Sequence, residues 1–340
     1  MHVFEPASAS PEEWRAYHEF RRQRHEEEAP EDPWTPDDVA ERRLKRADPY
    51  VADHRWLVFR EGRVAAELSA STMTPLSPEY ESNKHLLFAE GWVLSAARRQ
   101  GIGSGWIPLL VALMERYGAR LLTVDTHDES GHAFLRRLGG EPRYSEAESR
   151  LDFREVDWIL LTDWVREGQA RSPQTQLELY VDRLPEERRE EFSRVSTELL
   201  NTMPFEGLDH GDIVQTTDTL NEWYGRLDMF GSLHHAYLTR ESDGSISGMT
   251  DVLKHPYETG FVHQLFTGVH PSARGRGLGK WLKAAMLLHI RAVHPETVLM
   301  STENAGSNAS MLAINRALGF RRFRTSTTYQ LGLRELAQLV

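Results

Sequence analysis

The chain has 340 residues, enough for two ordinary domains or one large one. Hydrophobic residues make up 40% and charged residues 27%, as in an ordinary globular protein, and there is no cysteine. The lack of cysteine excludes disulfides, thiolate metal sites and a cysteine nucleophile. A formal net charge of −11 argues against a nucleic-acid partner and favours neutral or cationic substrates, although solubility alone explains the acidity equally well.

The sequence gives no sign of a membrane protein or of an exported one. No uninterrupted apolar run approaches the roughly 20 residues that span a bilayer. The first residues lack the basic flank and apolar stretch of a signal peptide. We therefore expect a cytoplasmic protein without a membrane partner.

The first half of the chain predicts alternating helices and strands. Residues 11–24 begin with proline and acidic residues, as the first turns of helices prefer. Pro108 must lie within the first turn of its helix, which therefore starts no earlier than about Ser104. Expected next are strands at 55–60 and 63–71 separated by Glu61-Gly62, a strand at 86–94, a helix at 106–117, a β-type run at 119–124 and a second helix closing on Gly139-Gly140.

The second half repeats this order. A helix at 156–169 connects the halves, and the boundary predicted near Ser172-Pro173 gives domains at 1–172 and 173–340. Expected in the second half are a helix at 185–200, strands at 236–240 and 246–253 separated by Asp243-Gly244-Ser245, a strand at 261–269, a helix at 280–293, a β-type run at 297–301 and a second helix closing on Gly319-Phe320.

One glycine-rich turn occurs in both halves, at residues 98–103 and 274–279. The offset between the copies is 176 residues at Gly101/Gly277 and 180 at Gly139/Gly319. A near-constant offset over several elements indicates a duplicated domain.

Such a turn at a helix N-terminus offers backbone N–H groups to a phosphate. A Walker loop needs four residues between its first glycine and Gly-Lys, followed by Ser or Thr. Here three residues separate Gly275 from Gly279, and Trp281 follows Lys280, so this class is excluded. A dinucleotide fingerprint also fits poorly, because each turn comes after several strands.

The spacing Arg98-x-x-Gly101-x-Gly103, repeated as Arg274-x-x-Gly277-x-Gly279, resembles the Q/R-x-x-G-x-G/A pyrophosphate loop of the GNAT acetyltransferase superfamily. In the second copy the resemblance extends upstream to residues 269–274, where a strand end and a proline lead into the loop. It extends downstream to Asn308, Asn315 and Gly319-Phe320. The chain is therefore identified as two tandem GNAT domains, similar in layout to the mycothiol synthases.

The resemblance implies an α/β fold with a mixed sheet splayed between its central strands, and acetyl-CoA as co-substrate in the cleft. The pyrophosphate would lie on N–H groups of residues 276–279, and an N–H near Val269 would polarise the thioester carbonyl. The donor-binding residues expected are Val269, Arg274, Gly275, Arg276, Gly277, Leu278, Gly279, Asn304 and Asn308 in the second copy, and Arg98, Gly101, Ile102 and Gly103 in the first.

The implied reaction is direct acetyl transfer to the primary amine of a small molecule. The usual tyrosine acid of the superfamily is replaced by Leu135 in the first copy and by Asn315 in the second, where the amide can only donate a hydrogen bond to sulfur. The first copy departs further, with Asp128 in place of the helix-opening asparagine and Gly140 in place of phenylalanine. We therefore predict a catalytic C-terminal copy and a degenerate N-terminal one, in a monomer or a homodimer.

The candidate catalytic residues are His263, Glu303 and Asn315. His263 and Glu303 are candidate bases, but His263 can equally be a solvent-facing strand residue and Glu303 can simply shape a turn. No metal is expected, because the histidine spacings complete no metal motif. Two other functions stay open: a catalytically silent acyl-CoA-binding protein, and a tRNA-dependent aminoacyltransferase, which the negative charge and the CoA loops disfavour.

Overall fold

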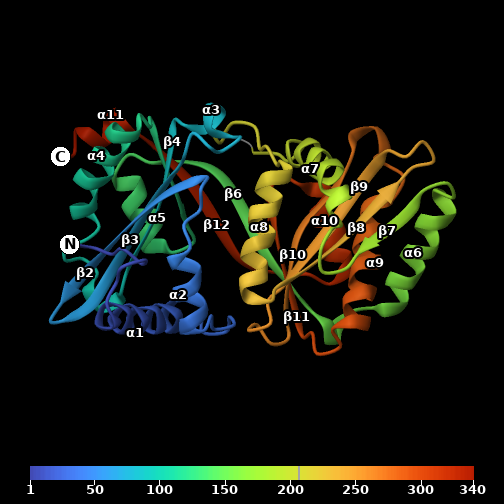
Figure 1. Ribbon diagram of the computed structural model, residues 1–340, viewed down its shortest axis with the longest axis horizontal. Helices are drawn as coiled ribbons and strands as arrows, with labels where there is room; N and C mark the ends of the chain where they lie inside the picture. Colours follow the sequence, from blue (N-terminus) through green and yellow to red (C-terminus); the bar gives the residue numbers. More distant parts are fainter. Residues whose placement is uncertain (206) are drawn as a thin grey trace. The chain divides into compact units, whose positions relative to one another are not determined.

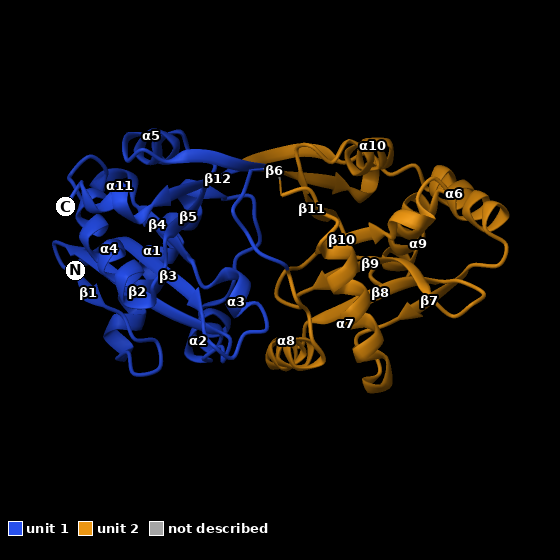
Figure 2. Ribbon diagram, turned by 90° about the horizontal axis from the view of Figure 1, so that it is seen from above, with its two compact units in different colours: residues 1–145, 206–212, 326–340 blue, residues 146–205, 213–325 orange. Residues whose placement is uncertain are grey.

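The computed structural model describes residues 1–205 and 207–340, which form two compact units. Unit 1 comprises residues 1–145, 206–212 and 326–340, and unit 2 comprises residues 146–205 and 213–325 (Figure 2). Each unit contains one of the two glycine turns. The boundary at residues 172/173 concerns the duplicated sequence segments and stays a prediction. Among the described residues, no helix has both the length and the apolar character needed to cross a membrane.

Unit 1 is built on a mixed sheet with strand order β1-β2-β3-β4-β5-β12, in which β4 and β5 are parallel (Figure 1). Its strands are β1 (His2–Val3), β2 (Val51–Arg60), β3 (Arg63–Met73), β4 (Leu86–Val93), β5 (Leu121–Thr126) and part of β12 (Arg321–Gly332). Its helices are α1 (Pro11–Glu28), α2 (Asp37–Lys45), α3 (Tyr80–Asn83), α4 (Ile107–Tyr117), α5 (Glu129–Arg137) and α11 (Leu333–Ala337), with 3-10 turns η1 (Ser95–Ala97) and η2 (Ser104–Trp106).

Unit 2 repeats this plan with strand order β6-β11-β10-β9-β8-β7, in which β10 and β11 are parallel. Its strands are part of β6 (Glu141–Asp152), β7 (Gln176–Tyr180), β8 (Leu233–Arg240), β9 (Ile246–Lys254), β10 (Phe261–Val269) and β11 (Leu299–Ala305). Its helices are α6 (Trp158–Arg171), α7 (Glu186–Leu200), α8 (Thr217–Phe230), α9 (Leu278–Val293) and α10 (Ala309–Leu318), with 3-10 turns η3 (Phe153–Glu155) and η4 (Pro271–Ala273).

The predicted helix starts follow from local chemistry. Ser10 and Glu13 form a capping box at the start of α1, with Pro11 in its first turn. Pro108 lies in the first turn of α4, which is preceded by the 3-10 turn η2, so the expected limit on the start of this helix is confirmed. Helices α2 and α8 were not predicted, although Thr216 caps α8 with its side chain and Gly231 ends it in the left-handed conformation.

The two central strands of each unit separate after a few residues. In unit 2, Phe261 to Gln264 pair with Leu299 to Thr302, whereas β10 continues to Val269. In unit 1, Leu86 to Phe88 pair with Leu121 to Thr123, whereas β4 continues to Val93. The predicted mixed α/β sheet is confirmed, and its parallel strands are paired only at their N-terminal ends.

Strands β6 and β12 each begin in one unit and end in the other. They are equivalent strands of the duplication, 180 residues apart in the chain. Residues 146–152 of β6 pair with β11 in unit 2, and residues 327–332 of β12 pair with β5 in unit 1. Each half of the chain thus supplies the strand that pairs with the open edge of the other half's sheet. The periodicity of the sequence does not reveal this exchange.

The unit 2 sheet is covered on both faces. One face packs on α6 and α9 through residues such as Val262 and Met300. The opposite face packs on α7 and α8 through residues such as Leu238 and Met249. Lys283 of α9 is only 2% exposed, and its ammonium lies 5.3 Å from the centre of the Phe320 ring. Burial lowers the pKa of Lys283 to about 7.

The strand exchange predicts that the end of the chain stabilises unit 1. Deleting residues 326–340 removes Tyr329, Leu331 and Leu336, all at most 2% exposed in the unit 1 core, and leaves the edge of β5 unpaired. Hydrogen exchange by mass spectrometry should show β5 losing its protection. Deleting only the exposed residues 338–340 is the control. Unchanged protection of β5 in the longer deletion would contradict the exchange.

Lys283 predicts a distinct pH dependence of stability. Since its folded pKa of about 7 lies below its ordinary 10.5, the unfolded chain binds the extra proton between these two pH values. The free energy of unfolding should therefore rise as pH increases through this window. Lys283→Met should abolish that rise and stabilise the chain at pH 7 by roughly 1–3 kcal/mol. Urea unfolding at pH 7 and pH 9 tests this, with the exposed Lys280→Met as control. An unchanged slope in Lys283→Met would refute the assignment.

Candidate functional site

The second glycine turn joins the end of β10 to the start of α9. After η4, the backbone passes through two left-handed residues, Gly275 at φ 80° and Gly277 at φ 84°. A Cβ at Gly275 would meet nothing within 4 Å, so the glycine is required by its backbone conformation and not by crowding. The first intrahelical bond of α9 runs from the Trp281 N–H to the Gly277 carbonyl at 3.1 Å. The N–H groups of residues 278–280 therefore have no intrahelical acceptor.

The first glycine turn has the same backbone path with a different residue. Arg99, at φ 63°, takes the position of Gly275, and Gly101, at φ 80°, takes that of Gly277. A left-handed arginine costs energy that glycine does not. The helix that follows opens with the 3-10 turn η2 instead of a full α-turn. Both turns can offer backbone donors, but only the second stands at the head of a regular α-helix.

Equivalent arginines fix both turns to their strands. The Nε of Arg274 donates to the carbonyl of Val269 at 3.2 Å, and the Nε of Arg98 donates to the carbonyl of Val93 at 2.9 Å. Arg98 also forms an ion pair with Asp128 at 3.1 Å. Burial opposes ionisation of Asp128, but its hydrogen bonds with Ser130 and the charge of Arg98 outweigh this and lower its pKa. The guanidinium of Arg98 is therefore already paired with a carboxylate of unit 1.

The side chain of Arg276 takes no part in the main-chain role expected of this residue. Its Nη1 lies 2.9 Å from Glu241, and its guanidinium also donates to Ser172 at 3.2 Å and Thr175 at 2.5 Å. Burial opposes ionisation of Glu241, but hydrogen bonds from Arg276, Ser247 and Thr175 prevail and lower its pKa. Arg276 thus ties the turn to the end of α6 and the start of β7, and has only its main chain left for a ligand.

Arg171, which sequence reasoning missed, lies beside the turn. Its Nη1 is 3.6 Å from the point that a Cβ at Gly277 would occupy. A Cβ at Gly168 would fall 2.5 Å from the ring of Trp281, so the missing side chain lets α6 and α9 pack closely and brings Arg171 to this place. The exposed cation therefore stands next to the unpaired N–H groups, as an anion site requires. No signal in the sequence links residue 171 to residue 277.

The remaining turn residues act through their backbone. Leu278 is 1% exposed and Ile102 is 8% exposed, so their side chains belong to the cores. A Cβ at Gly279 would lie 3.5 Å from Ile314, whereas one at Gly103 would lie 3.2 Å from the ring of Phe134. The last glycine of each turn thus allows the second helix to pack on the turn, and the contact is tighter in the first copy.

His263 is held between two polar side chains on the sheet face that packs on α7 and α8. Its Nε2 lies 2.5 Å from the carboxylate of Glu258, and its Nδ1 lies 3.2 Å from the hydroxyl of Ser301. The side chain of His263 is 32% exposed and that of Glu258 is 12% exposed. His263 and Ser301 face each other in the parallel pairing just before β10 and β11 separate. With the carboxylate at Nε2, the imidazole can accept a proton only at Nδ1, where the Ser301 hydroxyl lies.

Glu303 lies two residues after Ser301 on β11, and therefore on the same face of the sheet. Its side chain is exposed, and its cross-strand neighbour is Glu148 of β6. The Glu148 carboxylate is bound by Arg150 and by Arg324, each at 2.8 Å. The structure thus brings His263 and Glu303 to one face, with Glu303 further along the separating strand.

Two of the three asparagines of the predicted site are hydrogen-bonded to each other, and the third caps α10. The Nδ2 of Asn315 donates to the Oδ1 of Asn304 at 2.5 Å, and Asn315 is 2% exposed. Among the described residues, the buried Oδ1 of Asn315 has no hydrogen-bond partner. The Asn308 side chain accepts from the Met311 N–H at 3.2 Å and so caps α10. A cavity of about 200 Å³ beside Asn315 is lined by Ala147, Ser149, Leu312, Asn315, Arg316, Phe320 and Arg322.

A register shift in β10, between Gln264 and Thr267, is braced by residues that sequence reasoning also missed. The carboxylate of Asp251 accepts from the Phe266 N–H at 2.9 Å and lies 3.1 Å from Nε2 of the buried His234. The amide of Gln264 donates to the Asp251 carbonyl at 2.6 Å. These contacts hold the irregular backbone where β10 leaves β11.

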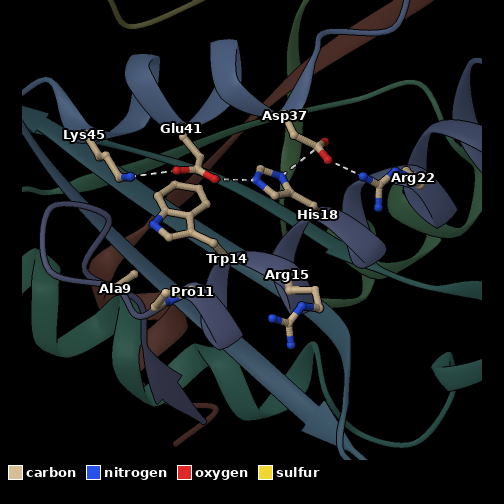
Figure 3. A pocket seen from close by; sticks show the side chains of 9 residues that line it. All are labelled: Ala9, Pro11, Trp14, Arg15, His18, Arg22, Asp37, Glu41 and Lys45. Carbon is tan, nitrogen blue, oxygen red and sulfur yellow. Dashed lines mark hydrogen bonds and ion pairs between the residues drawn. The ribbon is translucent and has the colours of Figure 1, made fainter.

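Unit 1 has a hollow of about 440 Å³ between α1 and α2 (Figure 3). The buried His18 lies at its base, 3.0 Å from Glu41, and stacks on Trp14 with ring centres 5.4 Å apart. Charges of both signs pair across it, including Lys45 with Glu41 at 2.7 Å. The hollow is lined by Ala9, Pro11, Trp14, Arg15, His18, Arg22, Asp37, Glu41 and Lys45. Since its ionic groups neutralise one another, the hollow favours no single class of ligand.

The repeated strand–turn–helix has counterparts in a known family. The model of the acetyltransferase (GNAT) family matches residues 14–139 and, separately, residues 197–320. The chain belongs to this family. The two matches confirm the predicted duplication and the predicted fold class, and they place the chain in a family of acyltransferase enzymes.

Two curated relatives are similar to parts of the chain. A stretch of 104 residues is 34% identical to mycothiol acetyltransferase of Saccharomonospora viridis, and covers 28% of this chain and 33% of that protein. A stretch of 90 residues is 34% identical to mycothiol acetyltransferase of Thermomonospora curvata, and covers 26% of this chain and 29% of that protein. The match thus spans a third of the length of these relatives or less.

Solved structures resemble the chain over nearly its whole length. A tandem GNAT protein from the clavulanic acid biosynthesis pathway has a TM-score of 0.74 at 20% identity, over 98% of both chains. A GCN5-related N-acetyltransferase from Sphaerobacter thermophilus has a TM-score of 0.61 at 15% identity, over 98% of this chain and 95% of that one. At such identities the likeness concerns the fold.

The left-handed residues of the two turns predict opposite mutational effects. Arg99→Gly should stabilise unit 1 by about 0.5–1 kcal/mol, because glycine adopts a positive φ without strain. Gly275→Ala should destabilise unit 2 by about 1 kcal/mol, although a Cβ there has open space. Chemical unfolding of each variant measures both effects. If Gly275→Ala were neutral, the left-handed turn would not be a constraint on the sequence.

Proposed function

We propose that the chain is an acetyl-CoA-dependent N-acetyltransferase that transfers the acetyl group directly to the primary amine of a small molecule in its C-terminal copy. The observation that carries the proposal is the turn at the head of α9. There the unpaired N–H groups of residues 278–280 lie beside Arg171, whose Nη1 is 3.6 Å from the Cβ position of Gly277. This combination suits the pyrophosphate of coenzyme A.

The residues around the end of the β10–β11 pairing support a transfer step at that place. His263, backed by Glu258 at Nε2, would take at Nδ1, through the Ser301 hydroxyl, the proton that the amine loses as it attacks the thioester. An N–H near Val269 would stabilise the oxyanion of the tetrahedral intermediate. Glu303, on the same sheet face, is the second candidate base. Asn315 would do no more than donate a hydrogen bond to the leaving sulfur, and its amide now donates to Asn304.

The hydrogen bond from Asn315 to Asn304 favours a second candidate, a catalytically silent acyl-CoA-binding protein, because the Asn315 amide is already used. The thiolate leaving group is itself weakly basic and can depart without a general acid, so loss of the usual tyrosine slows the reaction without forbidding it. The position of Glu258, His263 and Ser301, where the paired part of β10 and β11 ends, favours a transfer step there. We therefore prefer the enzyme.

Titration with acetyl-CoA should show micromolar binding at the second turn. Gly277→Glu should abolish it, because the carboxylate would occupy the anion site and repel the pyrophosphate. Gly244→Glu is the matched control, since Gly244 is also left-handed, at φ 87°, with open space around it, but lies in the β8–β9 hairpin. Absence of any acetyl-CoA binding would refute the whole proposal.

Thiol release in the presence of a panel of primary amines separates the enzyme from the silent protein. The enzyme should release coenzyme A with at least one amine, and His263→Ala should lower kcat by roughly 100-fold or more with little change in acetyl-CoA affinity. Binding without turnover across a broad panel would leave the silent protein as the answer.

A further inference from the structure

We propose that the β9–β10 turn of unit 2 binds a divalent transition-metal ion of the Zn²⁺ class, with His255, Glu258 and His263 as its ligands. One donor atom from each of the three side chains lies within 4.8 Å of the other two. The imidazoles of His255 and His263 meet edge to face with ring centres 5.8 Å apart. Two imidazoles and one carboxylate form a ligand set that Zn²⁺, Co²⁺ and Ni²⁺ accept.

The local sequence folds so that these three side chains converge. His255 is followed by Pro256, which favours a tight turn, and the Glu258 N–H closes the turn on the His255 carbonyl at 3.2 Å. A second turn follows, in which the Phe261 N–H donates to the Glu258 carbonyl at 3.2 Å, with Gly260 in the left-handed conformation at φ 74°. These successive reversals bring His263, at the start of β10, back beside Glu258.

A second observation points to a metal more directly. Each imidazole has its Nδ1 hydrogen-bonded to a serine hydroxyl from another element. The Nδ1 of His255 lies 2.7 Å from Ser232, which follows α8, and the Nδ1 of His263 lies 3.2 Å from Ser301 on β11. A serine hydroxyl in this place can accept from Nδ1–H, which is the tautomer in which the Nε2 lone pair is available to a metal. The serines therefore orient both rings before any ion arrives.

The burial of the cluster suits a bound ion that stays open to solvent on one side. The side chain of Glu258 is 12% exposed and that of His263 is 32% exposed. His255 is further held by stacking on Tyr257, with ring centres 5.0 Å apart and planes 13° apart. Three protein ligands leave one or two coordination positions for water or another small ligand.

A second group of histidines in the same unit is a weaker candidate. The buried His235 has its Nδ1 3.1 Å from Nε2 of His289 and its Nε2 3.3 Å from Nε2 of His294. Because opposite ring nitrogens of His235 face the two neighbours, the three imidazoles form a row and do not converge on one point. This row provides the comparison that the experiment needs.

Metal binding would also affect the site described above. The ion would take Nε2 of His263, the atom that now contacts Glu258, and so would remove the base. This consequence rests on the proposed function, but the binding itself does not. We therefore test binding in the absence of acetyl-CoA and amine, where failure of the metal site leaves the proposed function untouched.

The experiment titrates the full chain, without a histidine tag, with Co²⁺ and follows the visible d–d absorption of the ion, then displaces it with Zn²⁺. We expect one strongly absorbing Co²⁺ per chain, lost in His255→Ala and weakened roughly tenfold in Ser232→Ala, whose serine contacts the imidazole but no ion. His294→Ala is the matched control and should bind as the unaltered chain does. Circular dichroism of each variant checks that it has folded.

Two results would overturn the proposal. One is the absence of a Co²⁺ spectrum in the unaltered, folded chain at concentrations up to the millimolar range. The other is a spectrum that survives in His255→Ala but disappears in His294→Ala, which would assign the ion to the histidine row instead.

Discussion

The structure of the candidate site depends on one backbone constraint. Just past the point where its pairing with the parallel neighbour ends, a strand must lead within a few residues into a helix that begins at the turn. Left-handed residues at 275 and 277, and again at 99 and 101, make that turn. The side chains of Arg274 and Arg98 then fasten each turn to the strand it leaves. The backbone donors that an anionic ligand would contact follow from this turn, because it exposes unpaired N–H groups at the positive end of a helix dipole.

The two copies keep this constraint to different degrees. The second copy satisfies it with glycine and a regular helix, and Arg171, which pairs with Glu167 at 3.8 Å, lies beside the turn. The first copy tolerates a left-handed Arg99, starts its helix with a 3-10 turn ahead of Pro108, and engages Arg98 with Asp128. The backbone path is thus the same in both copies, although its residues differ. This asymmetry is the physical basis for assigning the reaction to the C-terminal copy.

The sequence predicted the features that depend on local chemistry. Glycine spacing, the offset between the copies and the position of Pro108 gave the duplication, the mixed fold and the start of α4. The exchange of β6 and β12 could not be predicted from the sequence. The two strands are equivalent, and the sequence pattern does not say which sheet edge each one covers. Arg171 and Asp251 were missed for a related reason, since their roles depend on packing between elements far apart in the chain.

The site residues show the same limit. His263 was found because it lies on the strand that leads into the turn, but its partners Glu258 and Ser301 come from a preceding turn and a parallel strand. Arg276 was expected at the pyrophosphate, and only the structure shows that its side chain is committed to Glu241. Residue type and spacing therefore predict the glycine turn and its backbone path, whereas the direction of a long side chain depends on neighbours that the sequence does not name.

The measurement that tests the account most directly is a crystallographic electron-density map of the chain with acetyl-CoA. The account predicts that the pyrophosphate lies on the N–H groups at the head of α9, close to Arg171, and that the thioester lies where β10 and β11 separate, within reach of His263. Acetyl-CoA bound at the head of α4 alone, or with its thioester away from the β10–β11 separation, would contradict the assignment of the reaction to the second copy.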